Sequence, residues 1–275
     1  MKNSSPSFFE SFDRVVITGG TSGIGSALLR QWGKLSGKTR FCNLSRSKPK
    51  DFPMEDRLVS IPCDLADRES ARTAADGCRK WLGEKDEGGR ILLINNSGFG
   101  CYGVFPRPTA DRNLAMIDVN VRGPVFLTAV LGDLLRASRG GVVNIASTAA
   151  FQPTPYLAAY GATKAFLLHW SLGLAEEWKA EGVRVLAVCP GPTETAFFRE
   201  AGFREAPLKK GSGQTADEVA AITLEALRKG KSLVTCGTGN RVMAAFSSKL
   251  PKPLASRLTG AIMRRLRLER FQETG

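Results

Sequence analysis

The fold is decided by three consecutive runs, Arg14-Val-Val-Ile-Thr18, Gly19-Gly-Thr-Ser-Gly-Ile-Gly25 and Ser26-Ala-Leu-Leu-Arg-Gln-Trp32. The first is short, apolar and β-branched, which predicts a buried strand, and the last is typical of a helix. Glycines between them would let the backbone approach a pyrophosphate, and a helix N-terminus offers it unpaired N–H groups and a partial positive charge. A strand, a glycine-rich turn and a helix in this order indicate a dinucleotide-binding unit rather than an ordinary turn.

A second apolar run, Arg40-Phe-Cys-Asn-Leu-Ser45, ends where the choice between two cofactors is made, about twenty residues after the glycines. An Asp or Glu at this place would bond a ribose 2′-OH and favour NAD. The sequence instead has Ser45-Arg46-Ser47-Lys48. Because a guanidinium and hydroxyls suit a 2′-phosphate, Ser45 and Arg46 predict NADP(H).

The motif Tyr160-Gly-Ala-Thr-Lys164 predicts acid–base chemistry. On a helix, residues four apart lie on one face. A cation beside a phenol favours the phenolate, and we expect Lys164 to lower the pKa of Tyr160 from the usual value of about 10. Ser147 ends the apolar run that begins at Gly141, and this position would let it bond the same substrate oxygen.

The 275 residues suffice for one large α/β domain. Strand-like and helix-like runs alternate, which predicts one doubly wound parallel sheet of about seven strands with helices on both faces. We expect strands at 14–18, 40–45, 58–62, 91–95, 141–147, 183–189 and 232–236, and helices near 22–33, 67–82, 110–137, 158–181 and 216–229.

We divide the chain into an N-terminal lead-in (1–12), frayed by expectation, the main domain (13–240) and a basic C-terminal extension (241–275). The net charge is +13, and the extension contributes eight basic residues against two acidic ones. In it Leu254, Leu258, Ile262 and Leu266 recur every fourth residue, which predicts an amphipathic helix over 254–271. We expect this apolar stripe to pack on the domain or on a neighbouring subunit. The alternative is a helix on a membrane surface, and no motif favours nucleic acid.

The cysteines and the single histidine limit the kinds of disulfide, metal site and catalytic triad that the chain is expected to form. The six cysteines form no Cys-x-x-Cys pair, which favours free thiols and a cytoplasmic protein. His169 is the single histidine, so neither a multi-histidine metal site nor a histidine-based triad is expected. No signal peptide and no apolar run long enough to cross a membrane is present.

Taken together, these motifs resemble the short-chain dehydrogenases/reductases, in their single-domain branch with a Rossmann fold. The resemblance covers most of the chain, and within the family it is greatest to bacterial oxidoreductases of undefined substrate. The matching pieces are Thr18–Gly25, Asp64-Leu65, Asn95-Asn96-Ser97-Gly98, Asn120, Ser147, Tyr160-x-x-x-Lys164 and Pro190-Gly-Pro-Thr-Glu-Thr195. Ser97 stands where the family usually has Ala.

The resemblance implies a hydride transfer between a nicotinamide and a carbonyl/alcohol substrate. It implies a catalytic set of Asn120, Ser147, Tyr160 and Lys164, with Tyr160 as the acid/base and Lys164 also holding the nicotinamide ribose. It implies that the cofactor is bound by Gly19, Thr21, Ser22, Gly23, Ile24, Gly25, Ser45, Arg46, Asp64, Leu65, Asn96, Ser97, Gly98, Tyr160, Lys164, Pro190, Gly191, Thr193 and Thr195.

Two other functions remain to be weighed. A non-catalytic NADP-binding sensor on the same fold would not need Ser147, Tyr160 and Lys164 in register. A sugar-nucleotide epimerase of the longer branch usually has a different glycine spacing and a separate substrate domain. Oxidation of NADPH in the presence of a ketone panel separates the three.

Apolar residues around the expected pocket favour a lipophilic substrate. One wall would come from Phe197, Phe198 and Phe203 after Pro190, and the other from Phe151, Pro153, Pro155 and Tyr156. Helices 110–137 and 158–181 also carry more apolar surface than one stripe needs. The family resemblance places the usual dimer seam on these two helices, so we expect a homodimer or homotetramer.

Overall fold

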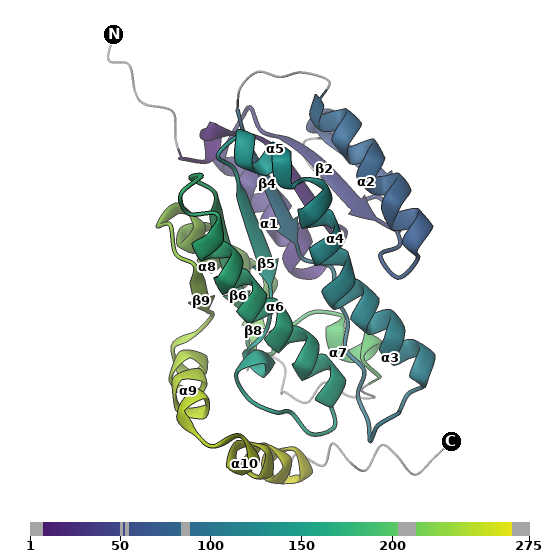
Figure 1. The fold of residues 1–275 in the computed structure, drawn as a ribbon, viewed down its shortest axis with the longest axis vertical. Coiled ribbons are helices and arrows are strands. Elements are labelled where there is room, and N and C mark those ends of the chain that lie inside the picture. The colour runs from purple at the N-terminus through teal and green to yellow at the C-terminus, as the bar shows by residue number, and fades with distance from the viewer. Residues whose placement is uncertain (1–7, 50–51, 53–54, 84–88, 203–212, 266–275) are drawn as a thin grey trace.

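A seven-stranded parallel sheet in the order β3-β2-β1-β4-β5-β6-β9 forms the centre of the protein (Figure 1). The computed structural model describes residues 8–49, 52, 55–83, 89–202 and 213–265. The strands of the sheet are β1 (Phe12–Thr18), β2 (Arg40–Ser45), β3 (Leu58–Pro62), β4 (Arg90–Asn95), β5 (Gly141–Ile145), β6 (Arg184–Cys189) and β9 (Leu233–Thr235). Each lies within two residues of a predicted strand at either end, and the doubly wound Rossmann architecture is confirmed.

Helices connect most successive strands and lead the chain back from the carboxyl ends of the strands to their amino ends. They are α1 (Gly23–Leu35), α2 (Arg68–Gly83), α3 (Ala110–Ile117), α4 (Gly123–Val130), α5 (Gly132–Ala137), α6 (Ala158–Glu177), α7 (Phe197–Glu200), α8 (Ala216–Arg228), α9 (Thr238–Lys249) and α10 (Lys252–Arg265). Short additional elements are 3-10 turns at Phe8–Ser11, Glu55–Arg57 and Thr148–Phe151, a π turn at Asp118–Arg122, and the strand pair β7 (Thr193–Glu194) and β8 (Gln214–Thr215).

Alternate residues of each strand serve two separate cores. On β1, Val15 and Ile17 pack with α1 and α8, whereas Val16 packs with α2, α4, α5 and α6 on the other face. Because both faces are covered, the central strands are apolar almost throughout, as a buried parallel sheet requires. Near-continuous apolar runs of this kind made the strands predictable.

The chain changes direction of winding between β1 and β4. β1 pairs with β2 on one side and with β4 on the other, so the connections after these strands leave toward opposite halves of the sheet. In doubly wound sheets the crevice outside the carboxyl ends of the strands at this point receives the ligand. All predicted site residues lie at this edge or on α6 and the π turn beside it.

The expected helix over 110–137 is three helices joined by a π turn and a break. α3 ends at Ile117, the wider turn Asp118–Arg122 follows, and α4 and α5 are separated at Leu131. A π turn inserts one residue into the helical repeat, and such insertions are frequent at functional sites. Here it carries Asn120, one of the predicted catalytic residues.

The N-terminal lead-in differs from its expected frayed state over residues 8–12. Phe9 and Phe12 are buried, and both rings meet the Trp32 ring edge-on at centroid distances of 5.1 and 5.6 Å. Phe8 packs in turn on Phe12. This aromatic cluster anchors the start of β1 to α1, so residues 8–12 belong to the core of the domain. Residues 1–7 lie outside the described residues.

The C-terminal extension also departs from expectation. It forms two helices, α9 and α10, because Pro251 interrupts the run. Leu254, Leu258 and Ile262 were expected to be the packing face, but they are 44%, 45% and 53% exposed. The helix instead contacts the domain through Ala255, which is buried, and Met263. The predicted helix continues to 271, and its fourth stripe residue, Leu266, lies outside the described residues.

The six cysteines are buried free thiols. Over residues 8–265, in the parts that the structure describes, no helix is both long and apolar enough to cross a bilayer. Within the same parts, no group of three or more metal-ligating side chains gathers. His169 lies on the exposed side of α6.

Candidate active site

Six connections at the carboxyl edge of the sheet bring the predicted site residues together. Gly19 to Gly25 join β1 to α1, Ser45 and Arg46 end β2, and Asp64 and Leu65 follow β3. Asn96, Ser97 and Gly98 follow β4, Ser147 follows β5, and Pro190 to Thr195 follow β6. Tyr160 and Lys164 lie in the first half of α6.

The turn between β1 and α1 depends on glycines for its backbone conformation and for its close approach to the helix. Gly19 and Gly23 have φ of +69° and +53°, a backbone conformation that favours glycine. A Cβ on Gly25 would lie 2.3 Å from the carbonyl oxygen of Gly19, so α1 starts directly against the turn. Ser22 occupies the N-cap without a side-chain cap bond. The first N–H groups of α1 therefore lack a side-chain cap, which fits an anionic pyrophosphate.

Three polar side chains that the motif search gave no role make buried hydrogen bonds at or beneath this edge of the sheet. Asn43 on β2 accepts a bond from the Gly20 N–H at 2.8 Å. The Thr18 hydroxyl accepts from the N–H groups of Asn96 and Ser97 at 3.0 and 2.9 Å. Asn144, described below, is the third. The signal that could have found them is a polar residue inside an otherwise apolar buried strand, because such groups are retained with a hydrogen-bond partner.

Asn96 was expected to contact the cofactor ribose, and its amide serves the turn itself. Its Nδ2 donates to the carbonyl oxygens of Thr18 and Gly19 at 3.0 and 2.9 Å. Ser97 lies equally close, since a Cβ on Gly19 would be 2.7 Å from its Oγ. The connections after β1 and β4 thus form one hydrogen-bonded unit across the switch point.

The part of the site at the ends of β2 and β3, where the adenosine was expected, carries positive charge at its rim. β2 leads Ser45 and Arg46 past the glycine turn, where the Gly19 N–H bonds the Leu44 carbonyl at 3.0 Å. Ser45 is half-buried and the Arg46 side chain is exposed. Asp64 accepts from the Ala66 N–H at 2.9 Å, which shapes the next loop, and Leu65 is buried beneath it. A 2′-phosphate beside Arg46 would gain charge-assisted hydrogen bonds.

The segment after β6 closes over the glycine turn from the opposite side. The Thr195 methyl lies 3.2 Å from where a Cβ of Gly23 would be. Thr193 is buried, and its hydroxyl donates to the Gly191 carbonyl at 2.9 Å. A side chain on Gly191 would collide with Asn240 at the start of α9. Two segments distant in sequence thus border the same crevice, as a bound dinucleotide requires.

Ser147, Tyr160 and Lys164 meet between β5 and α6. The Ser147 hydroxyl forms a hydrogen bond with the Tyr160 phenol. Lys164 Nζ lies 5.9 Å from the centre of the Tyr160 ring and donates to the Ile145 carbonyl at 2.8 Å. Both Tyr160 and Lys164 are buried.

The pKa values of this pair depart from the expectation for Tyr160. Burial raises the pKa of Tyr160 to about 12, against a lowering by the Ser147 hydrogen bond. Burial also lowers the pKa of Lys164 to about 8. The expected lowering of the phenol's pKa by Lys164 is absent here, because the ammonium is turned to the Ile145 carbonyl and desolvation dominates.

Asn120 is held by backbone and side-chain groups beside the other predicted catalytic residues. Its Oδ1 accepts from the Phe99 N–H at 3.1 Å, and its Nδ2 donates to the Phe99 carbonyl at 3.0 Å. The same Nδ2 donates to Thr163 Oγ1 at 3.1 Å, next to Lys164 on α6. The π turn is what places this fully buried amide against both partners.

A line of buried polar side chains runs beneath the site. Asn95 Nδ2 donates to Asn144 Oδ1 at 2.8 Å, and Asn144 Nδ2 donates to Ser171 Oγ at 2.8 Å. These residues belong to β4, β5 and α6, the elements that carry Asn96, Ser147 and Tyr160. The line ties the helix of Tyr160 to the two central strands.

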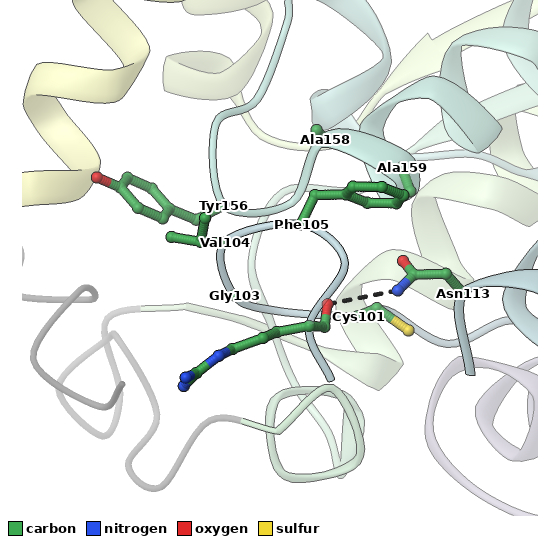
Figure 2. A pocket seen from close by; sticks show the side chains of 9 residues that line it. Cys101, Gly103, Val104, Phe105, Asn113, Tyr156, Ala158 and Ala159 are labelled. Atoms are coloured by element: carbon green, nitrogen blue, oxygen red, sulfur yellow. Dashed lines mark hydrogen bonds between the residues drawn. The ribbon is translucent and has the colours of Figure 1, made fainter. Parts of the chain in front are cut away.

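Aromatic and apolar side chains surround the exposed side of Tyr160. The Phe197 ring of α7 lies 5.2 Å from the Tyr160 ring, and Phe198 packs edge-on against Phe197. Beside α6, a cavity of about 150 Å³ is lined by the loop before α3, by Asn113 of α3, by Tyr156 and by the first turn of α6 (Figure 2). Its lining includes Tyr156 and Cys101. Of the expected wall residues, Phe203 lies outside the described residues.

Comparison with known proteins supports one family. Residues 13–205 match the family model described as short chain dehydrogenase. Serine 3-dehydrogenase of Rhizobium radiobacter is 32% identical over 217 residues, which cover 75% of this chain and 84% of that protein.

Solved structures share the fold. A short chain dehydrogenase from Burkholderia cenocepacia in complex with NADP superposes with a TM-score of 0.73 at 23% identity, covering 90% of this chain and 97% of that one. The 3-ketoacyl-(acyl-carrier-protein) reductase from Brucella melitensis, complexed with NADH, superposes with a TM-score of 0.67 at 22% identity, covering 83% and 98%.

Proposed function

Because this chain belongs to the short-chain dehydrogenase/reductase family, we propose that it is an NADP(H)-dependent oxidoreductase that interconverts a lipophilic carbonyl compound and its alcohol. The observation that carries the proposal is the meeting of Ser147 and Tyr160 by a hydrogen bond, one helical turn from Lys164. This group lies at the same sheet edge as the uncapped glycine turn. A binding protein without catalysis would have no use for a buried phenol and ammonium in this register.

The chain's own residues account for the proton side of the reaction. The nicotinamide, when bound, supplies or accepts the hydride. In reduction, Tyr160 gives its phenolic proton to the oxygen on which negative charge develops, and Ser147 donates a hydrogen bond to that oxygen. Lys164 Nζ lies 5.9 Å from the centre of the Tyr160 ring, and its ammonium would turn from the Ile145 carbonyl to offset the charge left on the phenolate. A pKa of about 12 keeps Tyr160 protonated and therefore ready as the acid at neutral pH.

The residues at the rim support NADP(H) over NAD(H). Arg46 is exposed beside the glycine turn, and no acidic side chain ends β2 to meet a ribose 2′-OH. The two solved structures compared above hold NADP and NADH, so the fold accepts either and the choice rests on Ser45 and Arg46.

A direct assay tests the activity. NADPH oxidation is followed at its absorbance maximum while ketones and aldehydes of graded chain length are added. The expected result is turnover that rises by about fourfold in kcat/KM for each added methylene, since each buried CH₂ contributes about 0.8 kcal/mol. Tight NADPH binding without turnover of any carbonyl would favour the sensor. A preference for small polar carbonyls would overturn the lipophilic substrate alone.

We also propose a homodimer, or a tetramer built from it, through α4 and α6. Phe166 on α6 is 42% exposed and stacks on Trp170, and Val125 and Phe126 on α4 are only partly covered. Light scattering at micromolar concentration should give at least twice the chain mass of 29.7 kDa. A mass of one chain would contradict this assembly.

A further inference from the structure

Helices α9 and α10 carry large apolar side chains that no other described part of the chain covers. On α9, Val242, Met243 and Phe246 are 66%, 57% and 62% exposed. On α10, Leu254, Leu258 and Ile262 form an exposed stripe of every fourth residue. Six large apolar side chains on one helix pair exceed the scattered exposure that a soluble surface normally shows.

The charge around this surface has one sign. Residues 238–265 contain no Asp or Glu. Arg241, Lys249, Lys252, Arg257 and Arg264 are all exposed along the same two helices. An apolar face bordered only by basic side chains is complementary to a layer of apolar chains beneath anionic head groups.

The same charge argues against a second copy of this chain as the occupant. A twofold interface places the same patch on both partners, so the basic side chains of one copy would face those of the other. No carboxylate on α9 or α10 could pair with them. Like charges brought together at an interface oppose association.

The position of the helix pair links it to the substrate side of the site. Ser247 on α9 donates to Gln152 at 3.0 Å, and Lys252 donates to the Phe151 carbonyl at 3.3 Å. Met263 packs in the cluster that holds Tyr156 and Tyr160. Figure 2 shows the Tyr156 ring pointing toward the C-terminal helix, with Val104 beside it. Val104 and Phe105 are themselves 50% and 70% exposed.

We propose that α9 and α10 dock the protein on the surface of a bilayer containing anionic phospholipid. The exposed apolar residues enter the region between head groups and acyl chains, and the basic residues bind the head groups. The protein then lies on the membrane with the loop of Tyr156 toward it, which would give a lipophilic substrate a direct route from the lipid. The docking itself does not depend on the proposed activity.

Vesicle flotation of the full chain tests the docking. The protein is mixed with vesicles of phosphatidylcholine alone or of phosphatidylcholine with phosphatidylglycerol. Binding should be confined to the anionic vesicles. Binding should be strong at about 0.01 M salt and weak at about 1 M, because the Debye length falls from about 30 Å to about 3 Å between these two concentrations. Equal binding to both vesicles, or no binding at low salt, would overturn the proposal.

Two variants with matched controls locate the surface. Arg241→Glu, Lys249→Glu and Arg257→Glu together should weaken binding at least about a hundredfold, since each basic residue near such a surface contributes about fivefold. Lys34→Glu, Lys38→Glu and Lys231→Glu make the same change of net charge elsewhere and should weaken it far less. An equal loss in both would show a general charge effect and contradict the docking site.

The apolar part is tested separately. Phe246→Ser with Leu258→Ser should reduce binding at high and low salt, whereas Leu35→Ser with Leu114→Ser removes equally exposed side chains elsewhere and should not. Because all four positions are exposed, the melting temperature should stay close to that of the unmodified chain. If the first pair instead halves the mass in light scattering and leaves flotation unchanged, a second copy occupies the surface and the proposal fails.

Discussion

The glycine turn at the start of α1 and the helix pair at the end of the chain differ in how completely their neighbours define them. Around the turn, Asn43 and Asn96 bind its backbone, and a single added carbon at Gly25 would overlap the Gly19 carbonyl. In α9, a Cβ on Gly239 would have nothing within 4 Å. Contacts within the molecule fix the conformation of the turn, whereas the helix pair presents a surface that is free to contact a partner outside the molecule.

The largest effect is expected at Tyr160, which packs in the same cluster as Met263 of α10. Tyr160→Phe removes the proton donor and should lower kcat by about 10²–10⁴-fold, the usual contribution of general acid catalysis. NADPH affinity, measured by fluorescence titration, should stay within a few fold because the glycine turn is untouched. Near-normal turnover on a verified substrate would show that Tyr160 is not the proton donor.

The pH dependence should isolate the buried ammonium. With a pKa of about 8, Lys164 is charged below pH 8 and neutral above it, while Tyr160 stays protonated to about pH 12. The value of kcat/KM for the cofactor, which reports groups of the free enzyme, should therefore fall about tenfold per pH unit above pH 8. A profile that is flat to pH 10 would show that the charge on Lys164 is not needed.

Cofactor choice should depend on Arg46, an exposed basic residue directly after β2. Arg46→Asp should lower NADPH affinity by about 10–150-fold, since a charged hydrogen bond contributes about 1.5–3 kcal/mol, and should raise NADH affinity. Replacement of the exposed Lys38 by Asp changes the net charge equally and should leave the preference unaltered. Equal affinity of the unmodified protein for both cofactors would contradict the assignment.

The smallest predicted effect tests the comparison of the two regions directly. Gly25→Ala should destabilise the protein by about 1–3 kcal/mol, because the new methyl is forced against the turn. Gly239→Ala makes the same change in α9 and should be neutral or stabilise by up to about 1 kcal/mol. Chemical unfolding of both variants gives the two free energies, and equal losses would mean that the C-terminal helices are packed as tightly as the turn.

The structure also shows which features could be predicted from the sequence and which could not. Largely apolar runs mark the strands, so β2 and β3 were predicted with their observed ends, although β3 lies at the edge of the sheet and is only partly buried. The break in helix 110–137 could not be predicted, because the π turn depends on Asn120 reaching the Phe99 backbone and Thr163 from other elements. An apolar stripe reports that a helix face avoids water, but it does not name the partner. For that reason Leu254, Leu258 and Ile262 were expected to pack on the domain or on a neighbouring subunit, and within the chain they are about half exposed.

The polar line from Asn95 through Asn144 to Ser171 has a consequence for how this chain reaches its one arrangement. Slipping β5 by one residue against β4, or moving α6 along the sheet by a turn, would leave buried amides without partners, and each costs about 1–3 kcal/mol. An apolar interior alone would tolerate such slips, because one methyl contact replaces another. The line therefore selectively destabilises misaligned forms of the sheet and helix. The folded protein keeps the one alignment in which Ser147 and Tyr160 lie next to each other.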